Sequence, residues 1–427
     1  MAIIGFLPLL ACPDSRTSQP RAGNNFPFTN GLYILRGSKH AFIREQSLAL
    51  HLHSTTAQHL ERLTSYLEQD PSNLQLLSDT ASAAFDSQQY DRCEILLARA
   101  EQLQPLSATL TNLKGLNALA RSQYASATAA FSQLAETYPD DFGVRYNLAY
   151  AKTMSGDYEG AANLLDSRTL EAVLQAPALK VRVLHYLGLL DEAAELGEQY
   201  GNRPNADNTL YAALATLALD RNQPDIARAY ALRAPTEAES LTTLGMLTLQ
   251  DVNSSPAVEL FEQALERNPQ SGRAWVGKGL GLLLGGHLKT AAGSLDHGAN
   301  IMKTHLGTWV AAGWAHLLAG SFDQARADFN TALEIDPNFA ETHGSLAVLE
   351  IKEGNTEAAQ RHATISLRLN SKCLSGALAQ SLLQTARGNA QSGQAILDKA
   401  LNTPLNATGM TIAQAIARQG FKLPDLK

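Results

Sequence analysis

The sequence is poor in cysteine and in charge. Its 427 residues include three cysteines, Cys12, Cys93 and Cys373, whose spacing fits neither a disulfide framework nor a metal-binding motif. Charged residues make up 18%, the formal net charge is −7, and no run of basic residues occurs. Because nucleic-acid binding needs clustered lysine and arginine to contact phosphates, we expect no nucleic-acid partner.

Motifs for catalysis and for metal binding are also lacking. The sequence has no G-x-S-x-G, no P-loop, no G-x-G-x-x-G and no H-E-x-x-H pattern, and its histidines are scattered. Gly277, Gly279 and Gly281 alternate inside a predicted helix, where small residues favour close helix packing. We therefore expect a non-catalytic protein with no cofactor and no metal ligand.

The first twelve residues, MAIIGFLPLLAC, form an apolar run that ends in Leu-Leu-Ala-Cys. This run is too short to span a bilayer as a helix. It resembles a bacterial lipoprotein signal, in which Cys12 would be lipidated and would anchor the protein to the periplasmic side of the cell envelope. No lysine or arginine precedes the run, and Pro8 lies inside it, which is typical of an ordinary apolar N-terminus. A cytoplasmic location is the alternative.

The stretch WVAAGWAHLLAGSFDQARADFNTALEIDP, from Trp309 to Pro337, shows the pattern that organises the chain. Trp309 and Gly313 lie on one face of a predicted helix, which Gly320 ends. A second helix carries Phe329 and ends before Pro337, which cannot continue it. Because two short helices cannot bury their apolar faces alone, this unit needs neighbours on both sides.

Three sets of residues repeat this unit along the chain. Prolines recur every 34 residues at 71, 105 and 139, and tyrosines recur every 34 residues at 90, 124 and 158. The third set marks the small position of each second helix and contains Cys93, Ala127, Ala161, Ala193, Ala227, Ala257, Ala291, Ala325, Ala359 and Gly393. The chain is therefore predicted to be a stacked array of helix pairs.

A 34-residue period with two helices per unit resembles the tetratricopeptide repeat family. The family signature of an aromatic residue, Leu-Gly, an aromatic residue, Ala, Phe, Ala and Pro is best preserved at 309–337, and it is clear again at 244–269 and 147–161. The resemblance covers about 74–407. It implies an all-α, right-handed superhelical solenoid of about ten helix-turn-helix repeats.

This interpretation divides the chain into segments. Residues 13–40 are expected to be a linker or an extended strap, and 41–73 a degenerate first repeat. Five repeats at 74–237 and five at 238–407 follow. The array is then either one rigid superhelix or two bodies hinged near 235, where a connection is four residues short. A capping helix and tail are expected at 408–427.

The resemblance also implies a binding groove, because set places of each first helix line the concave side in this family. Mapped onto this chain, these places are mostly apolar and include Asn112, Tyr146, Tyr150, Met154, Met246, Leu280, Val310, Trp314, Leu317 and Val348. Tyrosine and tryptophan often anchor interfaces, and Trp314 is the residue that we expect to matter most. The alternative role for each of these side chains is packing between neighbouring helices.

Some family members bind the carboxylate tail of a heat-shock chaperone with groove lysine, asparagine and arginine residues. Asn112 and Asn147 match that pattern, but Gln175 and Leu179 stand where basic residues are required. We therefore expect a partner protein or peptide with an apolar or amphipathic segment. The chain's own apolar segment at 26–35 is another candidate occupant of the groove.

The function that we expect is a non-catalytic scaffold for protein–protein interaction. If Cys12 is lipidated, the chain resembles tetratricopeptide lipoproteins that help to assemble pili or secretion systems in the bacterial envelope. Two alternatives are a regulatory or substrate-recruiting module for an enzyme on a separate chain, and a self-associating structural protein. The sequence identifies neither the partner, nor the pathway, nor the oligomeric state.

Overall fold

The computed structural model describes residues 49–251, 253–402 and 411. Over these residues it contains 22 α-helices, α2 to α23, and no β-strand. None of these described helices is both long enough and apolar enough to cross a membrane. The expectations for Cys12, for the strap and for the segment at 26–35 lie outside the described residues, as does nearly all of the predicted capping segment.

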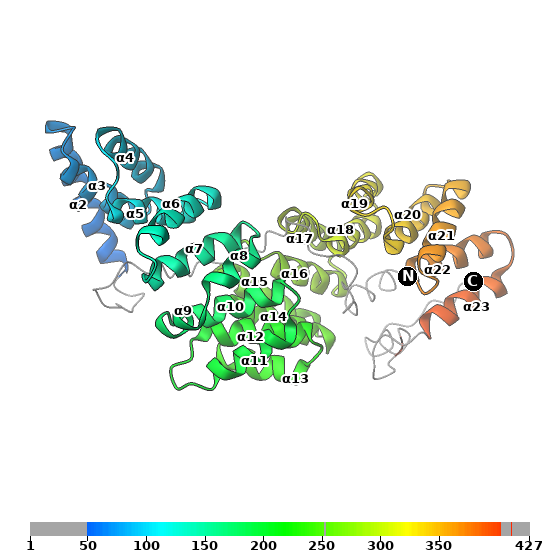
Figure 1. The fold of residues 1–427 in the computed structure, drawn as a ribbon. Helices are drawn as coiled ribbons and strands as arrows, with labels where there is room; N and C mark the ends of the chain where they lie inside the picture. Colours follow the sequence, from blue (N-terminus) through cyan, green and yellow to red (C-terminus); the bar gives the residue numbers. More distant parts are fainter. Residues whose placement is uncertain (1–48, 252, 403–410, 412–427) are drawn as a thin grey trace. The chain divides into compact units, whose positions relative to one another are not determined.

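Figure 1 shows the described helices as a ribbon coloured along the sequence. These helices cluster into two compact units. The division falls between Leu210 and Tyr211, inside α12 (Asn208–Asp220). We call the described residues up to Leu210 the N-terminal unit and those from Tyr211 the C-terminal unit. The short connection near 235 lies within the C-terminal unit, between α13 (Pro224–Arg233) and α14 (Ala238–Gln250).

The N-terminal unit begins with α2 (Ala49–Gln69) and continues as consecutive helix pairs. Its further helices are α3 (Leu74–Asp86), α4 (Tyr90–Leu103), α5 (Ala108–Ala120), α6 (Tyr124–Thr137), α7 (Phe142–Met154), α8 (Tyr158–Leu164), α9 (Ser167–Ala172), α10 (Ala176–Tyr186) and α11 (Leu190–Gly201). The extra helix α9 follows α8, which is only 7 residues long.

The C-terminal unit continues the same alternation of first and second helices. After α14 its helices are α15 (Ser254–Arg267), α16 (Gly272–Leu284), α17 (Leu288–Ile301), α18 (Leu306–Ala319), α19 (Phe322–Ile335), α20 (Ala340–Lys352), α21 (Thr356–Leu369), α22 (Leu374–Ala386) and α23 (Ala390–Leu401). Consecutive helices pack against each other, as in a repeat solenoid. The structure thus confirms the prediction of an all-α repeat solenoid.

Three of the described pairs are packed around an aromatic ring that lies over a glycine. A Cβ atom built on Gly115 would lie 2.6 Å from the ring of Phe131, and one on Gly245 would lie 2.7 Å from the ring of Phe261. Gly313 meets Phe329 in the same way. In all three pairs the ring comes 16 residues after the glycine, so one steric fit recurs with the repeat.

The turn between the two helices of a pair has a left-handed residue at a fixed place. Six such positions are glycines with positive φ, namely Gly156, Gly188, Gly286, Gly320, Gly354 and Gly388. Three more are Gln88, Ser122 and Asn222, whose φ angles lie between 57° and 59°. Because a side chain is strained in this conformation, glycine is the preferred residue here.

Replacement of Gly320 by alanine is expected to lower the free energy of unfolding by about 1–2 kcal/mol through backbone strain alone. A Cβ atom at Gly320 meets nothing within 4 Å, so no steric clash contributes. Gly293 is the matched control, because it also has open space but lies inside α17 with ordinary helical φ. Gly293→Ala is expected to raise the free energy of unfolding by about 0.5–1 kcal/mol. Thermal unfolding followed by circular dichroism measures both changes, and shifts of the same sign would contradict the assignment.

Candidate binding surface on the first helices

The ten predicted groove residues divide between the two units. The N-terminal unit holds four of them, on α5 and α7, namely Asn112, Tyr146, Tyr150 and Met154. The C-terminal unit holds six, on α14, α16, α18 and α20, namely Met246, Leu280, Val310, Trp314, Leu317 and Val348. The candidate surface is therefore described for each unit separately.

Most of the six residues in the C-terminal unit are enclosed. Leu280, Val310, Leu317 and Val348 are buried in the same hydrophobic core as Phe261 and Phe329. Met246 is half-buried and packs against that core. Packing between helices therefore accounts for the four buried residues, and Met246 alone of the six keeps an accessible side chain.

Trp314 was expected to face the groove, but the structure encloses it. Trp314 is only 2% exposed. Its indole Nε1–H donates to Ser345 Oγ on α20 at 2.8 Å. A buried indole N–H needs such an acceptor, because an unpaired one would lose its hydrogen bond with water. In this arrangement Trp314 joins α18 to α20.

The N-terminal unit leaves more of the predicted surface accessible. Asn112, Tyr150 and Met154 are half-buried, whereas Tyr146 is buried. Burial raises the pKa of Tyr150 above its usual range, and the neighbouring phenols of Tyr146 and Tyr124 raise it further. Tyr150 therefore stays neutral at physiological pH, and it packs in part against the hydrophobic core of this unit.

Basic character next to this surface comes from α10. Arg182 lies close enough to Tyr150 to act on its pKa, in the lowering direction. The guanidinium of Arg182 also donates to the backbone carbonyl of Thr209 at 3.2 Å, which fixes its position. Asn147 on α7, which the chaperone-tail pattern would require to be accessible, is buried.

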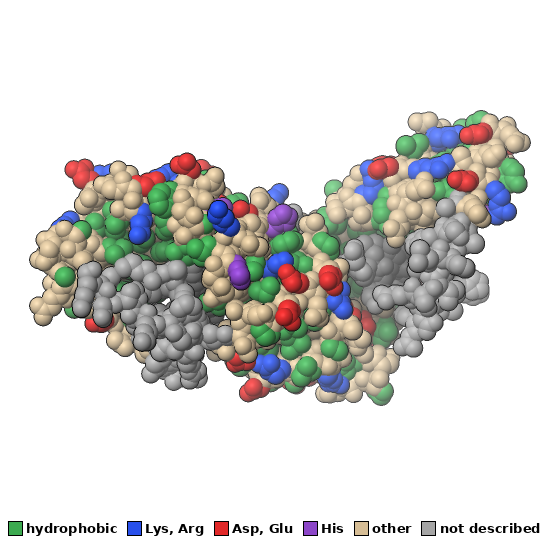
Figure 2. All heavy atoms as spheres, turned by 180° about the vertical axis from the view of Figure 1, so that it is seen from behind, with side chains coloured by type: hydrophobic (Ala, Val, Ile, Leu, Met, Phe, Trp, Pro, Cys, Tyr) green, Lys and Arg blue, Asp and Glu red, His purple; other side chains and the backbone are tan. Residues whose placement is uncertain are grey.

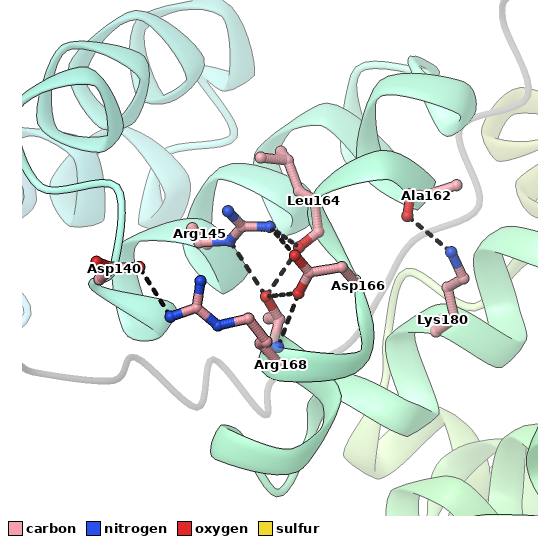
Figure 3. A network of polar contacts seen from close by, with 8 residues as sticks. Asp140, Arg145, Ala162, Leu164, Asp166, Arg168 and Lys180 are labelled. Carbon is pink, nitrogen blue, oxygen red and sulfur yellow. Dashed lines mark hydrogen bonds and ion pairs between the residues drawn. The ribbon is translucent and has the colours of Figure 1, made fainter.

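The repeat formed by α7, α8 and α9 is irregular, and a polar network holds these helices together (Figure 3). The guanidinium of Arg145 on α7 donates to Leu164 O at 3.2 Å, to Asp166 Oδ2 at 2.7 Å and to Thr169 Oγ1 at 3.2 Å. Asp166 also accepts from the backbone N–H of Thr169 and so caps α9. The network fixes α9 against α7 where α8 ends early.

Two further cations support the same repeat. Lys180 on α10 donates to the carbonyl oxygen of Ala162 at 2.7 Å, and Arg168 donates to Asp140 at 2.9 Å (Figure 3). Lys180 interacts near the C-terminal end of α8, where backbone carbonyls lack helical partners. Lys180 thus joins α8 to α10, and Arg168 joins α9 to the connection that precedes α7.

Charge is not segregated on the visible face of the described residues. Figure 2 shows acidic and basic side chains interspersed among hydrophobic and neutral ones on that face. This distribution agrees with the net charge of −7 and the absence of a basic run, and it is unlike the single-sign field that nucleic-acid binding requires.

Gly277, Gly279 and Gly281 have packing partners, as the sequence indicated. A Cβ atom on Gly277 would overlap the ring of Phe261, and one on Gly279 would lie 2.5 Å from Leu295 Cγ. A Cβ atom on Gly281 would lie 2.7 Å from Val258 Cγ2. Close approach of α16 to its neighbours therefore explains the three glycines.

One group of potential metal ligands escaped the sequence search. Asp296, His316 and Asp328 come from three consecutive helices, and their ligand atoms all lie within 4.8 Å of one another. His316 lies 20 residues after Asp296 and 12 residues before Asp328, so the three residues form no local sequence motif. The only signal in the sequence is that the two aspartates lie in successive second helices, on either side of His316.

Comparisons with known families identify three segments of the chain. Tetratricopeptide repeat models match residues 118–182, 253–296 and 307–339. A comparison with curated proteins gives no match.

Solved structures give likenesses of low sequence identity. The crystal structure of the APC/C hetero-tetramer Cut9–Hcn1 has a TM-score of 0.39 at 12% identity, over 87% of this chain and 89% of that chain. The MamA RS-1 ArsTM double mutant has a TM-score of 0.34 at 19% identity, over 38% of this chain and 94% of that chain. The three matched segments are therefore similar to tetratricopeptide repeats, and each of them lies within the described helix pairs.

Proposed function

We propose that this chain is a non-catalytic scaffold that binds a protein or peptide partner through the first helices of its N-terminal unit. Tetratricopeptide repeats and a solenoid fold fit a protein–protein interaction scaffold. The observation that carries the proposal is that Asn112, Tyr150 and Met154 are only half-buried on α5 and α7.

The residue types on this surface favour an apolar or amphipathic partner segment. A tyrosine supplies a rigid ring with one polar group, and a methionine adapts its shape to different apolar side chains. The carboxamide of Asn112 can donate and accept, as a peptide backbone requires. An amphipathic helix or an extended apolar segment has the matching chemistry.

The proposal is tested with site-specific crosslinking in the native host. A photoreactive amino acid at position 154 is expected to crosslink a partner, and Tyr150→Ala is expected to weaken capture of that partner by about tenfold or more. Tyr138 is the matched control, because it is an exposed tyrosine at the end of α6, outside the first helices. Crosslinks of equal yield from positions 138 and 154, or equal capture by Tyr150→Ala and Tyr138→Ala, would contradict the proposed surface.

A finer role in assembling a bacterial envelope machine extends this proposal. Its support is the Leu-Leu-Ala-Cys ending of residues 1–12, which resembles a lipoprotein signal. Globomycin-sensitive processing at Cys12 is the expected result, and an intact N-terminus on the native protein would exclude this extension without touching the scaffold proposal.

A further inference from the structure

Three polar side chains meet at the junction of α17, α18 and α19. His316 Nε2 lies 3.1 Å from each carboxylate oxygen of Asp296 and 3.9 Å from Asp328 Oδ2. Asp296 belongs to the second helix of one repeat, and His316 and Asp328 belong to the next repeat. The group therefore links two consecutive repeats of the C-terminal unit.

Asp328 is the unusual member of this group. It is 9% exposed, and its Oδ2 atom is buried without a hydrogen-bond partner. His316 lies beyond hydrogen-bonding distance of this oxygen. A buried carboxylate oxygen normally has a partner, because its desolvation is costly.

Among the described residues, His316 is the one cationic group that acts on Asp328. The charged groups that act on Asp328 are His316 and Asp296, and those that act on His316 are Asp296 and Asp328. No lysine or arginine of the described residues takes part in either set. Burial raises the pKa of Asp328 to about 7, with a further contribution from Asp296, while His316 acts in the lowering direction.

The arrangement matches the ligand requirements of one class of ion. One imidazole nitrogen and two carboxylate oxygens are a donor set for Zn²⁺, which binds such ligands at about 2.0–2.2 Å in tetrahedral sites. Tetrahedral ligands at that distance are about 3.4 Å apart, so His316 and Asp296 already have nearly the required separation. Asp328 Oδ2, at 3.9 Å from His316 Nε2, would move closer when an ion binds.

The fourth position would face solvent. The side chain of Asp296 is 38% exposed, whereas those of His316 and Asp328 are 15% and 12% exposed. Water can therefore complete a site with three protein ligands on the side of Asp296. Mg²⁺ and Ca²⁺ prefer about six or more oxygen ligands and are poorly served by an imidazole.

We propose that Asp296, His316 and Asp328 bind one divalent first-row transition-metal ion of the Zn²⁺ class. The ion pairs with the orphaned oxygen of Asp328 and joins α17, α18 and α19. An ion that binds the folded state only also stabilises it. The metal thereby fixes one junction between repeats.

The proposal is tested on the metal-free full-length protein. Titration with Co²⁺, followed by its absorption spectrum, and calorimetric titration with Zn²⁺ count the bound ions. Asp296→Asn, His316→Gln and Asp328→Asn are each expected to lose the same single equivalent of binding. The matched controls Asp323→Asn and His287→Gln alter exposed side chains outside the group and are expected to keep it.

A thermal readout checks that the ion acts at this junction. Zn²⁺ is expected to raise the Tm of the wild type and of both controls, and Mg²⁺ is not. Asp296→Asn carries the test even if a buried variant fails to fold, because its side chain lies partly in solvent. Equal metal binding by the wild type and Asp296→Asn would place the ion on other residues. The three residues would then form an ion-pair network only, and the proposal would be overturned.

Discussion

Replacement of Phe261 by alanine is expected to lower the free energy of unfolding of the C-terminal unit by about 3–5 kcal/mol. Phe261 is fully buried, and its ring lies against Gly245 of α14 and Gly277 of α16. Neither glycine has a side chain that can move into the space that the ring vacates. The variant therefore leaves a cavity between the first helices of two consecutive repeats, and a cavity of this kind relaxes only in part.

A second substitution makes this prediction sharper. In the wild type, Gly277→Ala is expected to destabilise by about 1–3 kcal/mol, because its Cβ atom would overlap the Phe261 ring. In the Phe261→Ala background the same change is expected to stabilise, because alanine partly fills the cavity and favours the helix. The sign of the Gly277→Ala effect therefore reverses between the two backgrounds.

Urea unfolding followed by circular dichroism measures the four proteins of this double-mutant cycle. Phe322→Ala is the control for loss of an aromatic ring, because Phe322 begins α19 and is only half-buried. A smaller loss is expected for that variant. Additive effects of Phe261→Ala and Gly277→Ala would show that ring and glycine do not share one space.

Repetition explains why so much of this fold follows from the sequence. A glycine and a phenylalanine keep one offset of 16 residues in three units, as at Gly313 and Phe329, so a single steric fit recurs along the sequence. The turn between the two helices of a pair can also be predicted from the sequence where glycine occupies its left-handed position, as at Gly320. Ser122 and Gln88 adopt the same left-handed conformation although they are not glycines. The residue type therefore does not predict these two turns.

Between 166 and 207 the sequence keeps Gly188 and Ala193 in phase with the repeat but loses its aromatic and proline positions. The structure of the irregular repeat depends on Arg145, whose guanidinium reaches Thr169, 24 residues further along the chain. A contact of this kind is made by the tertiary fold and not by local propensity. The early end of α8 and the added helix α9 could therefore not be derived from periodicity.

The candidate site was less predictable than the fold. Counting places along a first helix identifies the helix face within about one residue, and one residue turns a helix by about 100°. That error moves a side chain from an accessible face to the packed interface with the next helix. Tyr150 lies on one side of this boundary and Trp314 on the other. Asp296, His316 and Asp328 have no shared sequence motif, so only the fold brings them together.

Replacement of Trp314 is the second change for which we expect a large loss of stability. From the sequence, Trp314→Ala together with Tyr150→Ala would be expected to abolish partner binding and to leave the helix content intact, so the indole would contribute to binding and not to packing. From the structure, Trp314→Ala alone is expected to lower the free energy of unfolding by about 3–5 kcal/mol, because it removes a buried indole between α18 and α20.

Trp314→Phe separates the two contributions of the indole. It keeps most of the buried volume and removes the hydrogen bond to Ser345, so a smaller loss of about 1–2 kcal/mol is expected. Ser345 Oγ still donates to Glu341 O at 2.7 Å, which limits that loss. Tyr150→Ala, at a half-buried place in the other unit, is expected to change stability less than Trp314→Ala.

Thermal unfolding and partner capture must be measured on the same preparations of these variants. Reduced Tm for Trp314→Ala, with capture weakened in Tyr150→Ala at unchanged Tm, would assign packing to Trp314 and binding to Tyr150. A wild-type Tm for Trp314→Ala together with lost capture would instead show that the indole faces a partner in solution, because loss of a buried indole cannot leave the free energy of unfolding unchanged. The two roles therefore make opposite predictions for a single substitution.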